Sequence, residues 1–197
     1  MNDIPDNETR QRILDAAEEL FSKRGYQSVT LRDIAEVVGM RHASLYYYAP
    51  KGKEGLFIEV MERMLQRHNA GMKHVLNQAG NDIGDQLRAV AHWFIHQPPM
   101  NLDRIFNSDM AMIDSVQAKR LSGMAMHMLT EPLYSALGQA RGTGQIANTE
   151  TGVAAMSLIS LVQGVNSIPE GDWIDLTKRE EIAQQAVELL LYGLLKR

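Results

Sequence analysis

The chain has 197 residues with 45% hydrophobic and 22% charged side chains, no cysteine and a net charge of −4. This composition predicts a globular protein with a substantial core, and the lack of cysteine excludes disulfides, thiolate zinc sites and cysteine catalysis. The N-terminus has no signal-peptide pattern and no segment reaches the roughly 18 apolar residues of a membrane span, so we expect a cytoplasmic protein with no membrane partner.

The first part of the chain predicts three short helices followed by a long one. Apolar residues spaced at i, i+4 and i+7 over 13–21 form the stripe of an amphipathic helix. Thr30, with Asp33 three positions later, resembles a capping box and predicts that a second short helix begins directly after Thr30. A third short helix is expected over 42–48, and a long helix begins near Lys53, after a turn that contains proline and glycine.

The remainder of the chain also has the helical period, and no segment alternates as a strand does. The expected helices span about 82–96, 101–113, 115–141, 149–167 and 177–196. Pro132 lies inside one of them and is expected to kink or split it. We therefore predict an all-α fold, in which an N-terminal three-helix helix-turn-helix domain over residues 1–57 is joined by the long helix to a helical domain over residues 58–197.

Residues 9–57 carry the most specific signal in the sequence. Apolar, glycine and polar positions occur there in one register: Ile13-Leu14, Ala16-Ala17, Leu20-Phe21, Gly25-Tyr26, Thr30, Ile34-Ala35, Gly39, Leu45-Tyr46 and Lys53. In this register the segment resembles the N-terminal signature of the TetR family of bacterial transcription regulators. Two positions depart from the family pattern. Ala49 stands where an aromatic residue is usual, and the turn from Pro50 to Lys53 is one residue longer, which would shift the phosphate-contacting lysine.

The resemblance implies a DNA-binding surface whose third helix enters the major groove. The charge along the chain agrees, because residues 20–56 have a net charge of +3 whereas the rest has −7. Arg41 would reach guanine O6 and N7, and Lys53 a phosphate. For each contact the plainer alternative is a helix cap, a surface ion pair or a solvated side chain. The resemblance assigns DNA contacts to Thr30, Arg32, Arg41, His42, Ser44, Tyr46, Tyr47 and Lys53.

The apolar, methionine-rich helices after Gly80 favour an adaptable pocket for a small molecule, although ordinary core packing is the alternative. His92 and His96 have the i, i+4 spacing of metal ligands, but the sequence offers no obvious third ligand, so we predict neither a metal site nor a cofactor. The candidate ligand contacts are His92, Trp93, His96, Phe106, Asp109, Met110, Met126 and His127.

The last two helices have the character of an interface. Residues 153–165 are apolar nearly all round, as expected of a helix that is covered on both sides. The resemblance implies that these two helices pair with their copies as a four-helix dimer interface, while an intramolecular core is the alternative. The candidate interface residues are Met156, Ile159, Val162, Gln163, Ile182, Ala186, Leu189, Leu190 and Gly193.

These features together predict a regulator and not an enzyme. The sequence has no nucleophile elbow, P-loop, dinucleotide fingerprint or HExxH pattern. We expect a homodimeric, ligand-responsive repressor that leaves a palindromic double-stranded DNA operator when a small, largely apolar effector binds. The alternative is a ligand-independent architectural or regulatory DNA-binding protein, which a filled core would favour. A third alternative, a small-molecule or metal-binding module without DNA affinity, conflicts with the basic segment.

Overall fold

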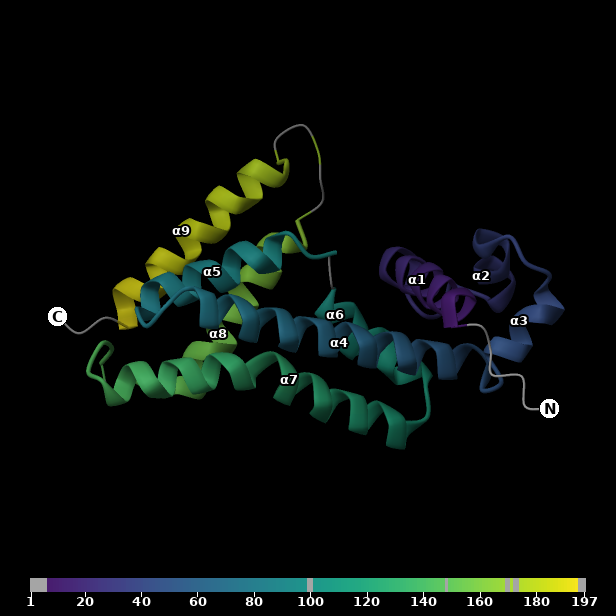
Figure 1. Ribbon diagram of the computed structural model, residues 1–197, viewed down its shortest axis with the longest axis horizontal. Coiled ribbons are helices and arrows are strands. Elements are labelled where there is room, and N and C mark those ends of the chain that lie inside the picture. The colour runs from purple at the N-terminus through teal and green to yellow at the C-terminus, as the bar shows by residue number, and fades with distance from the viewer. Residues whose placement is uncertain (1–6, 99–100, 148, 169–170, 172–173, 195–197) are drawn as a thin grey trace. The chain divides into compact units, whose positions relative to one another are not determined.

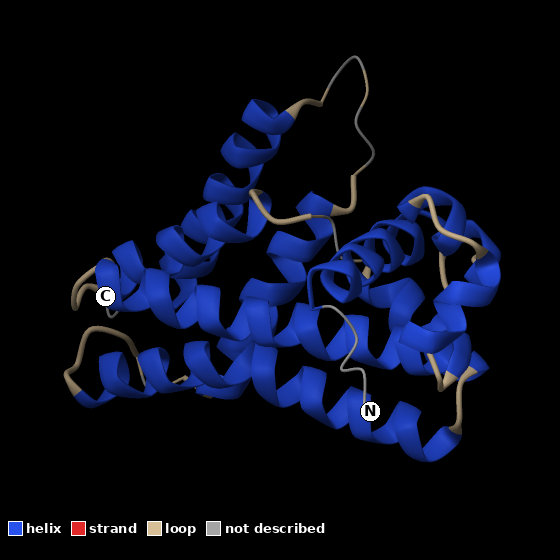
Figure 2. Ribbon diagram, turned by 45° about the vertical axis from the view of Figure 1, so that its right-hand side comes forward, coloured by secondary structure: helices blue, strands red, loops and turns tan. Residues whose placement is uncertain are grey.

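The structure is a computed structural model that describes residues 7–98, 101–147, 149–168, 171 and 174–194. Over these residues it contains nine α-helices, two further helical turns and, apart from an isolated bridge between Gly171 and Ile174, no strand (Figure 2). The predicted all-α class is confirmed. In the described part of the chain, no helix is both long and apolar enough to cross a membrane.

The helices form two compact units. The first combines described residues up to 64 with residues 101–123, and the second combines 65–98 with described residues from 124 onward. The first unit contains α1 (Asn7–Arg24), α2 (Leu31–Val38), α3 (His42–Tyr48), the beginning of α4 (Gly52–Gln78), α6 (Leu102–Arg104), the turns η1 (Ile105–Asp109) and η2 (Met110–Met112), and the beginning of α7 (Ser115–Gly142). The second contains the rest of α4 and α7, together with α5 (Ile83–Ile95), α8 (Thr151–Asn166) and α9 (Leu176–Leu194), as labelled in Figure 1.

An aromatic cluster forms the core of the first unit beside the turn between α1 and α2. Phe21 at the end of α1, Tyr26 in the turn and Phe57 of α4 are all buried. The ring of Phe57 meets Phe21 edge-on, with 5.3 Å between centroids, and lies 4.8 Å from Tyr26. Burial of one such side chain stabilises the fold by about 1.5–3 kcal/mol, and aromatic pairing adds about 0.5–1.5 kcal/mol. The cluster therefore holds α1 and the turn after it against the start of α4.

The segment 101–113 is not the continuous helix that its apolar pattern predicts. It forms three short pieces, of which η1 is a π-helical turn closed by the amide of Met110 on the carbonyl of Ile105. Because a π-turn pairs residues i and i+5, these two residues lie on the same side of the turn. Both are buried, and so is Asp109 between them. Inward-facing residues at this spacing cannot share one face of a regular α-helix, so the predicted helix is wrong here.

Arg104 and Asp109 form an ion pair beside the end of α1. We call this pair the Arg104–Asp109 clasp. Nη2 of Arg104 donates to the carbonyl oxygens of Phe21 at 2.8 Å and Ser22 at 2.6 Å. An α-helix leaves carbonyls of its last turn without intrahelical partners. The guanidinium supplies a partner for the carbonyl of Ser22 and a second one for that of Phe21, which also accepts from the amide of Gly25 at 2.9 Å. Nε of Arg104 lies 3.4 Å from Oδ2 of Asp109. Gly25, at φ 79°, follows α1 and leaves room for this carboxylate, because a Cβ there would lie 3.3 Å from Oδ1 of Asp109.

Pro132 does not split α7, although the sequence predicts a kink or a break there. The helix runs from Ser115 to Gly142 with the proline inside it. A proline has no N–H, so the carbonyl four residues earlier, that of Met128, has no partner within the helix. Nδ2 of Asn69 on α4 donates to this carbonyl at 2.8 Å. The neighbouring helix thus satisfies the group that the proline leaves unpaired.

In the second unit, α9 packs against both α5 and α8, and α5 packs against α8. Trp93 of α5 lies over Gly71 of α4, where a Cβ would be 2.0 Å from the indole ring. His68 of α4 is buried, with its ring edge-on to Trp93 at 5.4 Å between centroids. Because Gly71 has no side chain, the indole of Trp93 can lie directly against α4.

Candidate nucleic-acid interface

The cap of α2 has the geometry that the sequence predicts. Oγ1 of Thr30 accepts a hydrogen bond from the amide of Asp33 at 3.2 Å, and the amide of Thr30 donates to Oδ2 of Asp33 at 2.7 Å. The hydrogen bonds from Thr30, first from its hydroxyl and then from its amide, lower the pKa of the Asp33 carboxyl. The capping box is confirmed, while the contact of Thr30 with a phosphate stays a prediction.

Helix α3 is anchored on one side and exposed on the other. Leu45 is completely buried and Ala49, directly after the helix, is 3% exposed, so the small residue that departs from the family pattern fills a core position. Between these anchors, Tyr46 and Tyr47 are 51% and 52% exposed, whereas Tyr48 is half-buried. The rings of His42 and Tyr46 meet edge-on at 5.1 Å between centroids. The exposed predicted DNA contacts on or directly before this helix are Arg41, His42, Ser44, Tyr46 and Tyr47.

Arg32 on α2 is also exposed, so it remains available to a phosphate or a base edge. The attachment of α2 to α1 includes a hydrogen bond from Nη2 of Arg12 to the carbonyl oxygen of Val38 at 3.0 Å. This bond holds the end of α2, next to the turn that leads into α3. Helix α2 is thereby held to α1 by a polar contact as well as by the apolar core.

Lys53 is directed into the protein and not toward solvent. Its Nζ donates to the carbonyl oxygen of Tyr26 at 3.0 Å and lies 4.1 Å from the centroid of the Tyr26 ring. Burial, and then the charge of Glu54, raise the pKa of this tyrosine. Lys51, two residues earlier in the longer turn, is exposed. The sequence analysis missed Lys51, because a match in register assigns the phosphate contact to Lys53 and gives no side-chain direction.

A hollow of about 660 Å³ lies beside the same turn. Its lining includes charged side chains from α1 and α4, among them Arg10 and Glu59, which form an ion pair, and Arg10 also donates to the carbonyl oxygen of Tyr48. An apolar effector would leave these charges without water, which disfavours its binding. This hollow is therefore not the apolar pocket that the sequence predicts.

The predicted ligand contacts belong to both units. In the first unit, Asp109 already has partners on both carboxylate oxygens, the amide of Tyr26 at 2.9 Å on Oδ1 and the guanidinium of Arg104 on Oδ2. In the second, Met126 and His127 are exposed. The apolar pocket stays a prediction. The other candidates are Phe106 and Met110 in the first unit and His92, Trp93 and His96 in the second.

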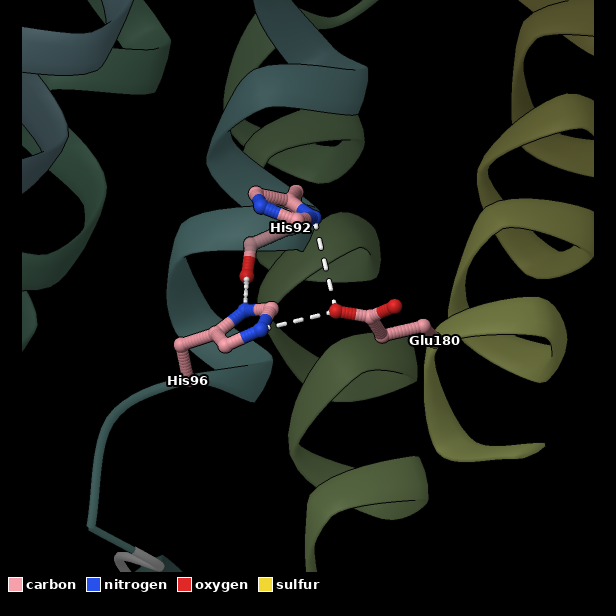
Figure 3. A group of neighbouring side chains, drawn as sticks. All are labelled: His92, His96 and Glu180. Carbon is pink, nitrogen blue, oxygen red and sulfur yellow. Dashed lines mark hydrogen bonds and ion pairs between the residues drawn. The ribbon is translucent and has the colours of Figure 1, made fainter. Parts of the chain in front are cut away.

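His92 and His96 come together with a residue that the sequence analysis did not find. Glu180 of α9 lies beside both imidazoles, as Figure 3 shows. No local spacing connects Glu180 to α5, so only the packing of α9 on α5 reveals this group. His68 was missed for the same reason, since its burial against Trp93 has no signal in the local sequence.

The predicted dimer residues differ in exposure. Ile159, Val162 and Gln163 are at most 8% exposed within one chain, so they pack in its own core, and their role in a dimer interface stays a prediction. They lie on the side of α8 that the other helices of the second unit cover. Met156 and Leu189 are 49% and 77% exposed. Among the other predicted positions, Ile182, Ala186 and Leu190 are half-buried and Gly193 is exposed. The same two helices also expose three apolar residues that were not among the predicted interface residues, Val153, Leu161 and Tyr192.

Comparison with known proteins supports the reading of the helix-turn-helix. Residues 13–60 match the family described as "Bacterial regulatory proteins, tetR family". This part of the chain is a helix-turn-helix domain of the TetR type. The match covers α1 from Ile13, α2, α3 and the first turns of α4, which are the elements that form the exposed surface described above. The match makes these helices a DNA-binding helix-turn-helix of the kind found in transcription regulators.

Two relatives show how far the similarity extends. The transcriptional regulator AcrR of Shigella flexneri is 38% identical over 89 residues, which are 45% of this chain and 40% of AcrR. The match thus spans less than half of that relative. The transcriptional repressor ComR of Escherichia coli is 27% identical over 91% of this chain and 88% of its own length. The identity is thus higher over the shorter match than over the nearly full-length one.

A solved structure shows the fold over nearly the full chain. The fatty acid degradation regulator FadR of Bacillus halodurans superposes with a TM-score of 0.76 at 18% identity, covering 98% of this chain and 99% of that one. At this identity the likeness concerns the fold alone.

Proposed function

We propose that this TetR-family protein is a homodimeric repressor that binds a palindromic operator through α3 and leaves it when a small, largely apolar effector binds. The observation that carries the DNA-binding part is the exposed face of α3. Side chains that can hydrogen-bond to bases or phosphates, those of Arg41, His42, Ser44, Tyr46 and Tyr47, lie on that face, while Leu45 and Ala49 anchor the helix from behind. A rigid helix that presents such a face fits the major groove.

The dimer is proposed from the exposed apolar residues of α8 and α9. Met156, Leu189 and Tyr192 are between 49% and 77% exposed, which is unusual for large apolar side chains of neighbouring helices unless a partner covers them. A two-fold dimer formed by these helices would present two copies of α3 to successive major grooves about 34–36 Å apart. Repression, as opposed to activation, is supported by the relative ComR, which is named as a transcriptional repressor.

The test of DNA binding begins with Arg41. Arg41→Ala is expected to cost about 1–3 kcal/mol of operator binding and to relax the sequence preference at one position in each half-site, because the guanidinium fork no longer reaches guanine. Operator variants at each position, titrated against the wild type and the variant, measure this effect. Uniform weakening over all operator sequences would place Arg41 on a phosphate and not on a base.

The lysines provide the matched comparison. Lys51→Ala is expected to weaken binding to all sequences similarly and to reduce the slope of log K against log salt by about one, because one phosphate contact is lost. Lys53→Ala should also weaken binding to all operator sequences. In addition, it should lower the free energy of unfolding, since Lys53 donates a hydrogen bond to the carbonyl oxygen of Tyr26. Denaturant unfolding of both variants separates these effects. If neither lysine nor Arg41 affects binding, the proposed recognition surface is wrong.

The effector part of the proposal is tested through Trp93. An apolar compound that binds beside this indole should change its fluorescence, and the change should disappear in Trp93→Phe. It should persist in Trp173→Phe, whose tryptophan lies outside the described residues. The same compound should raise the operator dissociation constant by about 5–150-fold. Binding of the compound without any effect on operator affinity, or no response in a broad screen together with a filled core, would favour the ligand-independent regulator.

A further inference from the structure

We propose that His92, His96 and Glu180 form a site for a divalent transition-metal ion, with Zn²⁺ as the best match, that joins the end of α5 to the beginning of α9. One donor atom from each residue lies within 4.8 Å of the other two. Both helices belong to the second unit, so the site does not depend on the DNA-binding helices. It is also independent of the repressor function proposed above.

The donor atoms have the spacing that a single ion requires. Nε2 of His96 lies 2.8 Å from Oε1 of Glu180, and Nδ1 of His92 lies 3.7 Å from the same oxygen (Figure 3). Ligand atoms bound to zinc at about 2.0–2.2 Å in tetrahedral geometry are about 3.4 Å apart. The two distances lie on either side of this value, so an ion can enter with small side-chain rotations.

A hydrogen bond outside the cluster orients one of the ligands. Nδ1 of His96 lies 2.8 Å from the carbonyl oxygen of His92, one turn earlier on α5. A carbonyl oxygen only accepts, so Nδ1 carries the proton and Nε2 is the nitrogen that faces Glu180. This is the arrangement in which metal-binding histidines are held, with the second ring nitrogen donating to a backbone carbonyl. In the charged imidazole, Nε2 also carries a proton and directs it at the carboxylate. In the neutral imidazole, Nε2 directs a lone pair there, and this lone pair can bind a metal ion in place of the proton.

The other end of the same helix pair shows what a simple ion pair looks like. Nε of Arg88, one turn before His92, lies 2.6 Å from Oε1 of Glu188, two turns after Glu180. The same guanidinium also pairs with Asp85 at 3.1 Å, so one cation is shared by two carboxylates there. At the end with Glu180, two imidazoles face a single carboxylate, and one of them is redundant for an ion pair. Two nitrogens and one oxygen around one point are instead the ligand set of a metal site.

The identity of the ion follows from the ligands and their exposure. Imidazole nitrogens select Zn²⁺, Cu²⁺ or Ni²⁺ over Ca²⁺ and Mg²⁺, which prefer all-oxygen sites. The side chains of His92, His96 and Glu180 are 59%, 39% and 28% exposed, so an ion can reach them and water can complete its coordination. Zn²⁺ accepts three protein ligands and one water. The ion would tie the start of α9 to α5 without closing the site.

The experiment measures Zn²⁺ binding to the untagged full-length protein by titration calorimetry against a competing chelator. We expect one Zn²⁺ per chain. His92→Gln, His96→Gln and Glu180→Gln should each weaken binding by more than the roughly 10–100-fold that loss of an outer-shell partner costs. His74→Gln and His127→Gln are the matched controls, because both histidines are exposed and lie outside the cluster. They should bind Zn²⁺ as the wild type does.

Thermal unfolding provides a second readout. Zn²⁺ should raise the midpoint of the wild type and of Arg88→Gln, which loses the ion pair at the other end, because the ion binds only the folded helix pair. It should not raise the midpoint of Glu180→Gln. The proposal is overturned if the three cluster variants bind Zn²⁺ like the wild type, or if binding occurs only in the millimolar range. A stoichiometry of one ion per two chains would also overturn it, because the ion would then bridge two copies.

Discussion

Replacement of Met156 and Leu189 together by glutamate is expected to convert the proposed dimer into monomers. Both side chains are exposed in the single chain, at 49% and 77%, so the change removes no contact of the chain's own core and the fold should persist. In a two-fold interface each new charge occurs twice and is buried against apolar surface or a like charge, which costs several kcal/mol. The dimer dissociation constant should rise by at least about 100-fold, which corresponds to about 2.8 kcal/mol.

Sedimentation equilibrium measures the dimer dissociation constant, and titration with operator DNA measures the loss of operator affinity. The monomeric variant should bind a full operator only weakly, because one copy of α3 reaches one half-site. Val116→Glu is the control, since Val116 is 70% exposed but belongs to the first unit, whereas α8 and α9 belong to the second. That variant should dimerise like the wild type. A double variant that remains dimeric would mean that α8 and α9 do not form the interface.

Asp109→Ala is expected to destabilise the protein by about 3 kcal/mol, because it breaks a buried charge pair and leaves a buried amide without a partner. Asp109 is 4% exposed and accepts a hydrogen bond from the amide of Tyr26. Arg104 forms an ion pair with Asp109 and also donates to the last carbonyls of α1. Loss of the clasp should loosen the end of α1, so operator affinity should fall as well. Urea unfolding followed by circular dichroism measures the stability.

Two variants locate the cause of this effect. Asp103→Ala removes an exposed carboxylate from the same segment and should change stability by less than about 0.5 kcal/mol. Asp109→Asn keeps an acceptor for the amide of Tyr26 and should cost less than the alanine variant. If Asp109→Ala is as stable as the wild type but no longer responds to an effector, Asp109 is a ligand contact and not a structural residue.

The local sequence was sufficient to predict most of the helices. The bounds predicted for α3 agree with the structure, and the capping box of Thr30 and Asp33 is present. Capping and amphipathic spacing are properties of neighbouring residues, so they can be read without knowledge of the fold. The register of apolar, glycine and polar positions in residues 9–57 was specific enough to identify the TetR family.

Tertiary contacts decided where side chains point and which of them meet. Lys53 has the sequence position of a phosphate contact, but its ammonium group binds the carbonyl of Tyr26. Asp109 binds the amide of Tyr26 in the turn after α1, and Glu180 meets His92 and His96 at the end of α5. No periodic pattern encodes contacts between residues so far apart in the sequence. Sequence periodicity determines which face of a helix is apolar, because it depends on residues one turn apart. The partners of a polar side chain depend on which distant helix packs against it, and that is a property of the folded chain alone.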